Sequence, residues 1–155
     1  MPVGFSIVGT LIALIMLLPS LVFFTWFPPI RVPHGLRESN RIFTILEKAG
    51  QVGALVFLAI SKDFFPPGHG STIVMLLMVV CIVIYYGLWF RYLKDGRSFA
   101  SLYKPFLGVP IPLAVFPVLA FGFAAWWGQC VWLGVSTALL AIGHWTVSYT
   151  IYRQL

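Results

Sequence analysis

The chain has 155 residues, of which 60% are hydrophobic and only 9% are charged. A soluble domain keeps about a quarter of its residues charged, so this composition excludes an ordinary soluble protein. The formal net charge is +6, but the cations border apolar segments and form no dense cluster. Contact with anionic lipid headgroups explains them, so we expect membrane lipids as partners and no nucleic acid.

Five apolar segments are each long enough to cross a bilayer, which takes about 20 helical residues. They cover about residues 3–27, 41–61, 72–91, 106–127 and 130–152. Together they leave no room for a separate soluble domain. The sequence therefore predicts one all-α integral membrane domain over residues 1–155, a compact bundle of five transmembrane helices.

The positive charges give this bundle an orientation. With five crossings and the N-terminus outside, Lys62 alone lies on the outer side. The other nine cations then fall at the inner face: Arg31, Arg37, Arg41, Lys48, Arg91, Lys94, Arg97, Lys104 and Arg153. Without the second crossing the ten cations would divide five and five. Since inner loops concentrate Lys and Arg, we expect a plasma (inner) membrane protein with its C-terminus in the cytoplasm.

The first two segments differ in how well they suit lipid. The first contains Pro19, which removes a backbone hydrogen bond, followed by Ser20. The second is the least lipid-like, because it carries Glu47, Lys48 and Gln51. It also has small residues four apart, which allow close approach of helix backbones. We therefore expect the second helix to lie at the centre, surrounded by the other four.

The last three segments add aromatic, proline and histidine signals. The third ends in Tyr85 and Tyr86 near a cation, as in the aromatic belts of membrane interfaces. The fourth opens with four prolines, Pro105, Pro110, Pro112 and Pro117. Their spacing predicts that its first half is not a regular helix, so that part has to be covered by protein or line a cavity. The fifth holds His144 well inside the span.

Several polar residues fall at one depth in this bundle. Counting the helical rise from the inner ends places Glu47 roughly 10 Å deep and His144 roughly 13 Å deep. An ionisable side chain within a span faces the bundle interior or a cavity and marks a candidate functional site. We expect a cytoplasm-facing intramembrane pocket at this level. The predicted ligand-binding residues are Ser20, Glu47, Gln51, Tyr85, Tyr86, Pro112 and His144.

These residues also have structural interpretations. Glu47 could lean back to the interface and form a solvated ion pair of little energetic weight with Lys48 or Arg41. His144 could instead satisfy the carbonyl that Pro19 frees or a neighbouring backbone group. Both interpretations stay open at this point.

The chain carries no catalytic or metal-binding signature of the common types. Its three histidines, His34, His69 and His144, fall on the inner loop, on the outer loop and inside a span. That distribution is unfavourable for one three-histidine metal centre. We expect no metal site and no cofactor.

Three classes of function fit these observations. The first is a protein that binds or carries a small hydrophobic or amphipathic ligand in an apolar pocket with few polar groups. The second is a membrane-embedded enzyme of the isomerase or cyclase type, in which Glu47 and His144 act as acid and base on a lipophilic substrate. The third is a subunit that packs against a larger membrane partner, or against copies of itself, through its small-residue seams. We rank the binder or carrier first.

In length, in number of expected spans and in tryptophan content the chain resembles the translocator or tryptophan-rich sensory proteins, which bind porphyrins and sterol-like molecules. The tryptophan- and proline-rich loop signature of that family is replaced here, because Phe106, Leu107 and Gly108 follow Pro105. The resemblance is one of size and topology, and it assigns no site residue.

Overall fold

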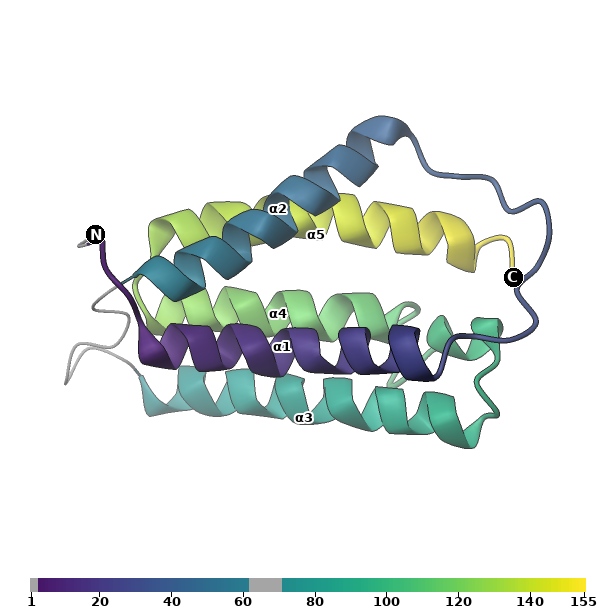
Figure 1. The fold of residues 1–155 in the computed structure, drawn as a ribbon, viewed down its shortest axis with the longest axis horizontal. Coiled ribbons are helices and arrows are strands. Elements are labelled where there is room, and N and C mark those ends of the chain that lie inside the picture. The colour runs from purple at the N-terminus through teal and green to yellow at the C-terminus, as the bar shows by residue number, and fades with distance from the viewer. Residues whose placement is uncertain (1–2, 62–70) are drawn as a thin grey trace.

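The computed structural model describes residues 3–61 and 71–155, and this part of the chain is all-helical (Figure 1). Its elements are α1 (Ile7–Trp26), α2 (Arg41–Ile60), α3 (Thr72–Lys94), the 3-10 turn η1 (Phe99–Leu102), α4 (Pro112–Trp127) and α5 (Val131–Tyr152). The predicted all-α fold is confirmed, and α1, α2, α3 and α5 are long and apolar enough to cross a membrane. Lys62 and His69 lie outside the described residues.

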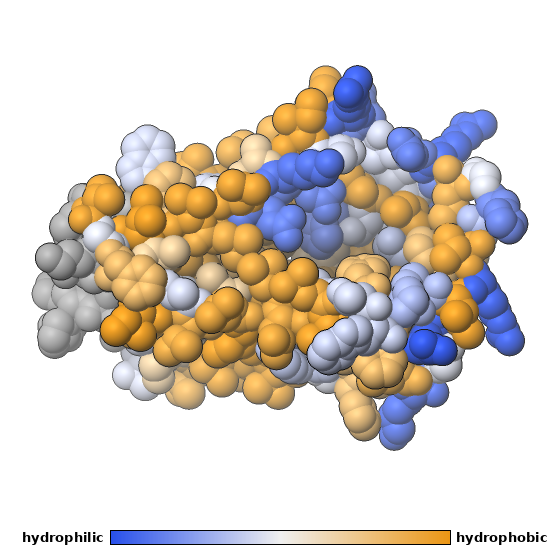
Figure 2. All heavy atoms as spheres, in the orientation of Figure 1, coloured by the Kyte–Doolittle hydropathy of each residue, from blue (hydrophilic) through white to orange (hydrophobic). Residues whose placement is uncertain are grey.

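The five helices form a ring in which each contacts the next. α1 lies beside α3, α3 packs on α4, α4 on α5, α5 on α2, and α2 meets α1 again. We call the end that holds the C-terminus, η1 and the start of α2 the charged end, because hydrophilic side chains gather there (Figure 2). The rest of the visible face is largely hydrophobic, with many exposed apolar side chains on the outer surfaces of α1 and α3.

Helices α2 and α5 make the closest pair in the bundle. A Cβ atom at Gly143 would collide with the backbone nitrogen of Glu47, and one at Gly50 would collide with the backbone of Leu140. Small residues let membrane helices approach until their backbones touch. Gly50 and Gly53 of the second segment therefore serve this interface, since a Cβ at Gly53 would meet the Ser136 side chain of α5.

The prediction that α2 is the central helix is wrong. Its outer face carries exposed apolar residues such as Ile45 and Val52, and its buried residues are only Gly50, Ala54 and Leu58. Helix α4 has eight buried residues and occupies the more enclosed position. The reason is that, of Glu47, Lys48 and Gln51, only Glu47 is partly withdrawn from the surface, so burial of α2 on one side suffices.

Helix α1 touches α2 at one end only. Gly4 N donates to Ile60 O and Ser6 N to Ala59 O, both at 2.8 Å, and a Cβ at Gly9 would collide with the Leu58 carbonyl. From there the two helices diverge toward the charged end (Figure 1). The α1–α2 boundary is thus closed at one end of the bundle and open at the other.

The charged end holds α1 against α3 instead. The Tyr92 hydroxyl donates to Phe27 O at 2.8 Å, and Ile30 N donates to Arg97 O at 2.9 Å. Further along the same loop, Arg37 N donates to the Gln154 side chain at 2.7 Å. The loop from α1 to α2 therefore crosses the charged end, fixed to α3 at its beginning and to the C-terminus near its end.

The prolines of the fourth segment act differently from the prediction. Residues 106–111 are not helical, and Phe106 and Val109 exchange backbone hydrogen bonds of 3.0 and 2.9 Å in a tight turn. Helix α4 begins at Pro112, where a proline ring suits the first helical turn. It then continues through Pro117 for 16 residues, about 24 Å at the usual rise. The irregular part is thus shorter than expected, and the helix is shorter than a typical membrane span.

Candidate functional site

A cavity of about 180 Å³ lies inside the ring of helices, in the half nearer the charged end. All five helices and η1 contribute to its lining, which is mostly apolar. Figure 2 shows hydrophilic side chains in a hollow between α1 and α2, bordered by hydrophobic surface on one side and by the charged end on the other. The cavity is therefore reached through the gap that the divergence of these two helices leaves.

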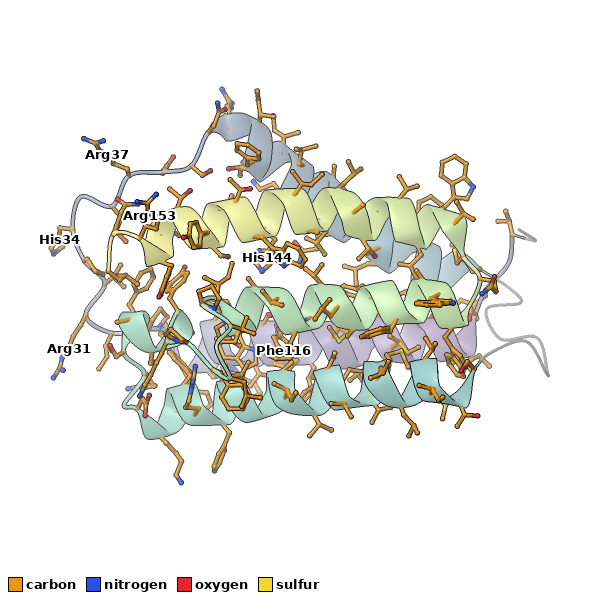
Figure 3. All side chains as sticks on the ribbon, turned by 180° about the vertical axis from the view of Figure 1, so that it is seen from behind. Arg31, His34, Arg37, Phe116, His144 and Arg153 are labelled. Atoms are coloured by element: carbon orange, nitrogen blue, oxygen red, sulfur yellow. The ribbon has the colours of Figure 1, made fainter. Side chains whose placement is uncertain are left out.

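The polar centre of this cavity is a contact between α2 and α5. The Nδ1 atom of His144 lies 2.6 Å from Oε1 of Glu47. Figure 3 shows the His144 side chain pointing from α5 toward the interior of the bundle. The two side chains are 31% and 23% exposed, respectively, so both are largely withdrawn from solvent. Because Gly143 brings the two backbones into contact, the neighbouring imidazole reaches the carboxylate directly.

This contact decides between the interpretations of Glu47. The carboxylate turns inward to a histidine, and the described ion pairs include no bond from it to Lys48 or Arg41. The interpretation as an interfacial ion pair is therefore wrong. When the Nδ1–H of an imidazole donates to a carboxylate, the ring is held in one orientation. Its other nitrogen, Nε2, then remains available for a different partner.

A second polar pair lies across the cavity between α1 and α3. The hydroxyl groups of Ser20 and Tyr85 share a hydrogen bond of 2.7 Å. The Tyr85 side chain is buried, and both residues line the cavity. Gln51 also lines the cavity, one helical turn from Glu47, and is exposed at the opening. Five of the seven predicted ligand-binding residues are thus brought together.

The structure does not bring Tyr86 and Pro112 to the cavity. The Tyr86 hydroxyl donates to Ile15 O at 2.7 Å, and this is the carbonyl that lacks a helical partner because Pro19 has no N–H. Tyr86 therefore fills the role considered for His144, and that alternative for His144 is wrong. Pro112 is buried at the first position of α4, where it helps to start the helix.

Among the residues of the cavity wall that were not expected from the sequence are Trp89 and Tyr103. Trp89 is 4% exposed, lines the cavity, and packs against Tyr85 with the ring centroids 6.3 Å apart. It follows Tyr85 by four positions, a spacing that puts two residues on one helix face. This spacing in the sequence could have predicted that Trp89 lies beside Tyr85 in the cavity wall. Tyr103 follows η1 and lines the wall on the side of the charged end. No sequence periodicity predicts that position, because a short 3-10 turn places it.

Tyr103 also lines a second, more open recess of about 420 Å³ at the charged end, together with Asp95, Lys104 and Tyr152. Its ring therefore stands between the cavity and the protein surface. Burial, and secondarily the negative charge of Glu47, raises the pKa of Tyr103 to about 12. The phenol is thus kept neutral, as a hydrogen-bond donor, far above physiological pH.

The residues of the cavity define what it can do chemically. A carboxylate and an imidazole in contact can transfer or hold a proton, and the surrounding apolar wall can hold a hydrophobic group. Within residues 3–61 and 71–155, no group of three or more His, Cys, Asp or Glu side chains is placed to hold a metal ion. His34 and Arg31 lie at the charged end, away from His144 (Figure 3).

Comparisons with known proteins add no assignment to this geometry. No protein-family model matches the chain, and neither the curated proteins nor the solved structures contain a significant match.

Proposed function

We propose that the chain is a multi-pass protein of the plasma (inner) membrane, with its N-terminus outside and its C-terminus in the cytoplasm. Four helices long enough to cross a bilayer support this assignment. The cationic residues labelled in Figure 3, Arg31, Arg37 and Arg153, all lie at the charged end, which the positive-inside rule assigns to the cytoplasm. In this proposal α4 also crosses the membrane, and the non-helical residues 106–111 before it span the remaining distance.

We propose further that the protein binds or carries a small hydrophobic or amphipathic molecule in the cavity. The observation that carries this proposal is the Glu47–His144 contact within a mostly apolar cavity that opens between α1 and α2. Polar groups within a bilayer cost free energy and are retained where they serve a function. A largely apolar pocket with a few oriented polar groups is the usual form of a small-molecule site.

The proposed route of entry is sideways from the lipid. The gap between α1 and α2 faces the region that the bilayer would occupy, and exposed apolar residues of α1 and α2 flank it. A hydrophobic ligand already dissolved in the membrane would reach the cavity without passing through water.

The first test is mass spectrometry of the small molecules that the gently purified protein retains. We expect a stoichiometric hydrophobic compound other than bulk phospholipid. Gln51→Trp, which narrows the opening, should remove most of it. The matched control is Val52→Trp, since Val52 is 61% exposed and does not line the cavity. Retention of phospholipid alone by the wild type and by both variants would contradict the proposal.

The 2.6 Å contact between Glu47 and His144 supports a second candidate, a membrane-embedded acid–base enzyme of the isomerase or cyclase type. The carboxylate would orient the imidazole, which would move a proton on the lipophilic substrate. If the retained compound is a substrate, the wild type in lipid nanodiscs should convert it and His144→Gln should not. Binding without any conversion by the wild type would favour the carrier and exclude this candidate for that compound.

A further inference from the structure

The charges inside the cavity indicate which head group its ligand carries. Among the described residues that line it, Glu47 is the one acid, and there is no lysine or arginine. Among the described lining residues, Glu47 therefore supplies the negative charge, and its partner is a histidine, which carries a positive charge only when it is protonated. With a neutral His144 the cavity is electrostatically suited to a cation and unsuited to an anion.

Within the described part of the chain, Glu47 has no lysine or arginine partner, although cationic residues outnumber acidic ones in this chain. The chain has ten Lys and Arg residues and four acids, and the other described ion pair joins Lys104 to Asp95 at the charged end, at 3.2 Å. Lys48 follows Glu47 directly in the sequence, but it is exposed and does not line the cavity. A carboxylate accepts several hydrogen bonds, and the contact with His144 uses one of its oxygen atoms.

Aromatic rings make up a large part of the same wall. They come from α1, α3, α4 and the residue that follows η1, and are those of Phe24, Tyr85, Trp89, Tyr103 and Phe121. The face of an aromatic ring attracts a cation, most strongly where water is excluded. A carboxylate among aromatic rings stabilises an organic ammonium group better than it stabilises a hydroxyl group of the same size, and it repels a carboxylate.

From these observations we infer that the ligand is a lipophilic cation, an amphiphile whose ammonium-type head lies near Glu47 and whose chain extends toward the opening between α1 and α2. This inference rests on the proposed function and specifies its ligand class. In the absence of the ligand, His144 is the partner of the carboxylate; in its presence, the ligand cation shares that carboxylate.

The experiment uses three amphiphiles with the same ten-carbon chain: decyltrimethylammonium, decanol and decanoate. Their equilibrium binding is measured with the full chain in nanodiscs of zwitterionic lipid, after subtraction of binding to empty nanodiscs. We expect the cation to bind about tenfold more tightly than the alcohol, and decanoate to bind least. Glu47→Gln should remove most of this preference, because the amide keeps the shape of the side chain but carries no charge to attract the ammonium group.

Two variants control for charge and for folding. Glu38→Gln makes the same chemical change at an exposed acid outside the cavity and should leave the preference intact. Glu47→Asp keeps the negative charge and should retain most of the preference, and circular dichroism checks that each variant is folded. Equal binding of the three amphiphiles, tighter binding of decanoate, or an undiminished preference in Glu47→Gln would overturn the inference while leaving the proposed function standing. Binding of none of them would overturn both.

Discussion

Helix α2 has two neighbours, and its boundaries with them are built in different ways. Against α5 the backbones touch at Gly50 and Gly143, and the contact continues to the stacked rings of Phe57 and Trp132. Against α1 the contact is confined to the region of Gly9, and the helices then diverge. All three helices are apolar, so hydrophobicity does not distinguish the boundaries. The positions of small residues decide where membrane helices touch and, in consequence, where a cavity remains.

The most direct way to break this arrangement is Gly143→Ala. The added Cβ would meet the backbone of α2, which cannot move aside like a flexible side chain, so the two helices must separate. We expect a loss of about 3 kcal/mol in the free energy of unfolding, despite the better helix propensity of alanine. Reversible unfolding in mixed detergent micelles measures this loss.

The matched control for that prediction is Gly87→Ala. A Cβ at Gly87 would have no neighbouring atom within 4 Å, so this exchange should leave stability unchanged or raise it by up to about 1 kcal/mol. If the two alanine variants had the same stability, the backbone contact between α2 and α5 would not be a main source of stability.

Gly9→Ala tests the other boundary. Its Cβ would collide with the Leu58 carbonyl near the end of α2, where the chain has more freedom to adjust than in the middle of two helices. We expect a smaller loss of about 1–2 kcal/mol in the free energy of unfolding. Because this contact is the closed end of the α1–α2 gap, a nitroxide pair at Leu18 and Val52 should also report a broader distance distribution. An unchanged distribution would show that Gly9 does not set the angle between the helices.

The hydrogen bond from Tyr86 to the Ile15 carbonyl, which Pro19 leaves without a helical partner, is expected to contribute about 1 kcal/mol to the free energy of unfolding. Tyr86→Phe removes the donor that satisfies the Ile15 carbonyl and should lower the free energy of unfolding by about that amount. In a Pro19→Ala background the alanine N–H can take over that role, so the same Tyr86→Phe exchange should cost much less. A double-mutant cycle measures the difference. Equal costs in both backgrounds would mean that Tyr86 does not act by satisfying the Ile15 carbonyl that Pro19 leaves without a partner.

The smallest expected effect concerns Tyr103. Removing the charge of Glu47 with Glu47→Gln should lower the pKa of Tyr103 from about 12, but only in part, because burial is the larger cause. Carbon-13 NMR of ring-labelled tyrosine follows this titration, and Tyr103→Phe assigns the signal. Glu38→Gln should leave the pKa of Tyr103 unchanged, and an equal effect of both variants would contradict the placement of Tyr103 beside Glu47.

The same titration has a consequence for stability. The pKa of Tyr103 in the folded state lies above the ordinary tyrosine value of about 10, so the unfolded chain loses this proton first as the pH rises. The resulting stabilisation is complete below about pH 10 and is lost as the pH rises toward 12. Tyr103→Phe should therefore flatten the alkaline part of the stability profile.

Depth in the bundle could be predicted from the sequence, and rotation about each helix could not. Counting residues from the charged ends placed Glu47 and His144 at one level, and both line the cavity. The same counting treated Tyr85 and Tyr86 alike. Adjacent residues on a helix point about 100° apart, and only Tyr85 faces the cavity. Tyr103 was missed because its position depends on how the η1 turn folds back on the bundle.

The sequence by itself determined the helical segments and the end of the molecule at which the cations gather. Both are local properties, because an apolar helix satisfies its own backbone hydrogen bonds and the charges follow the segment ends in chain order. Only the tertiary structure decided that α2 is not the central helix, that it packs on α5, and that it diverges from α1. Those features follow from steric contact at Gly9, Gly50 and Gly143, which depends on residues far apart in the chain meeting in space.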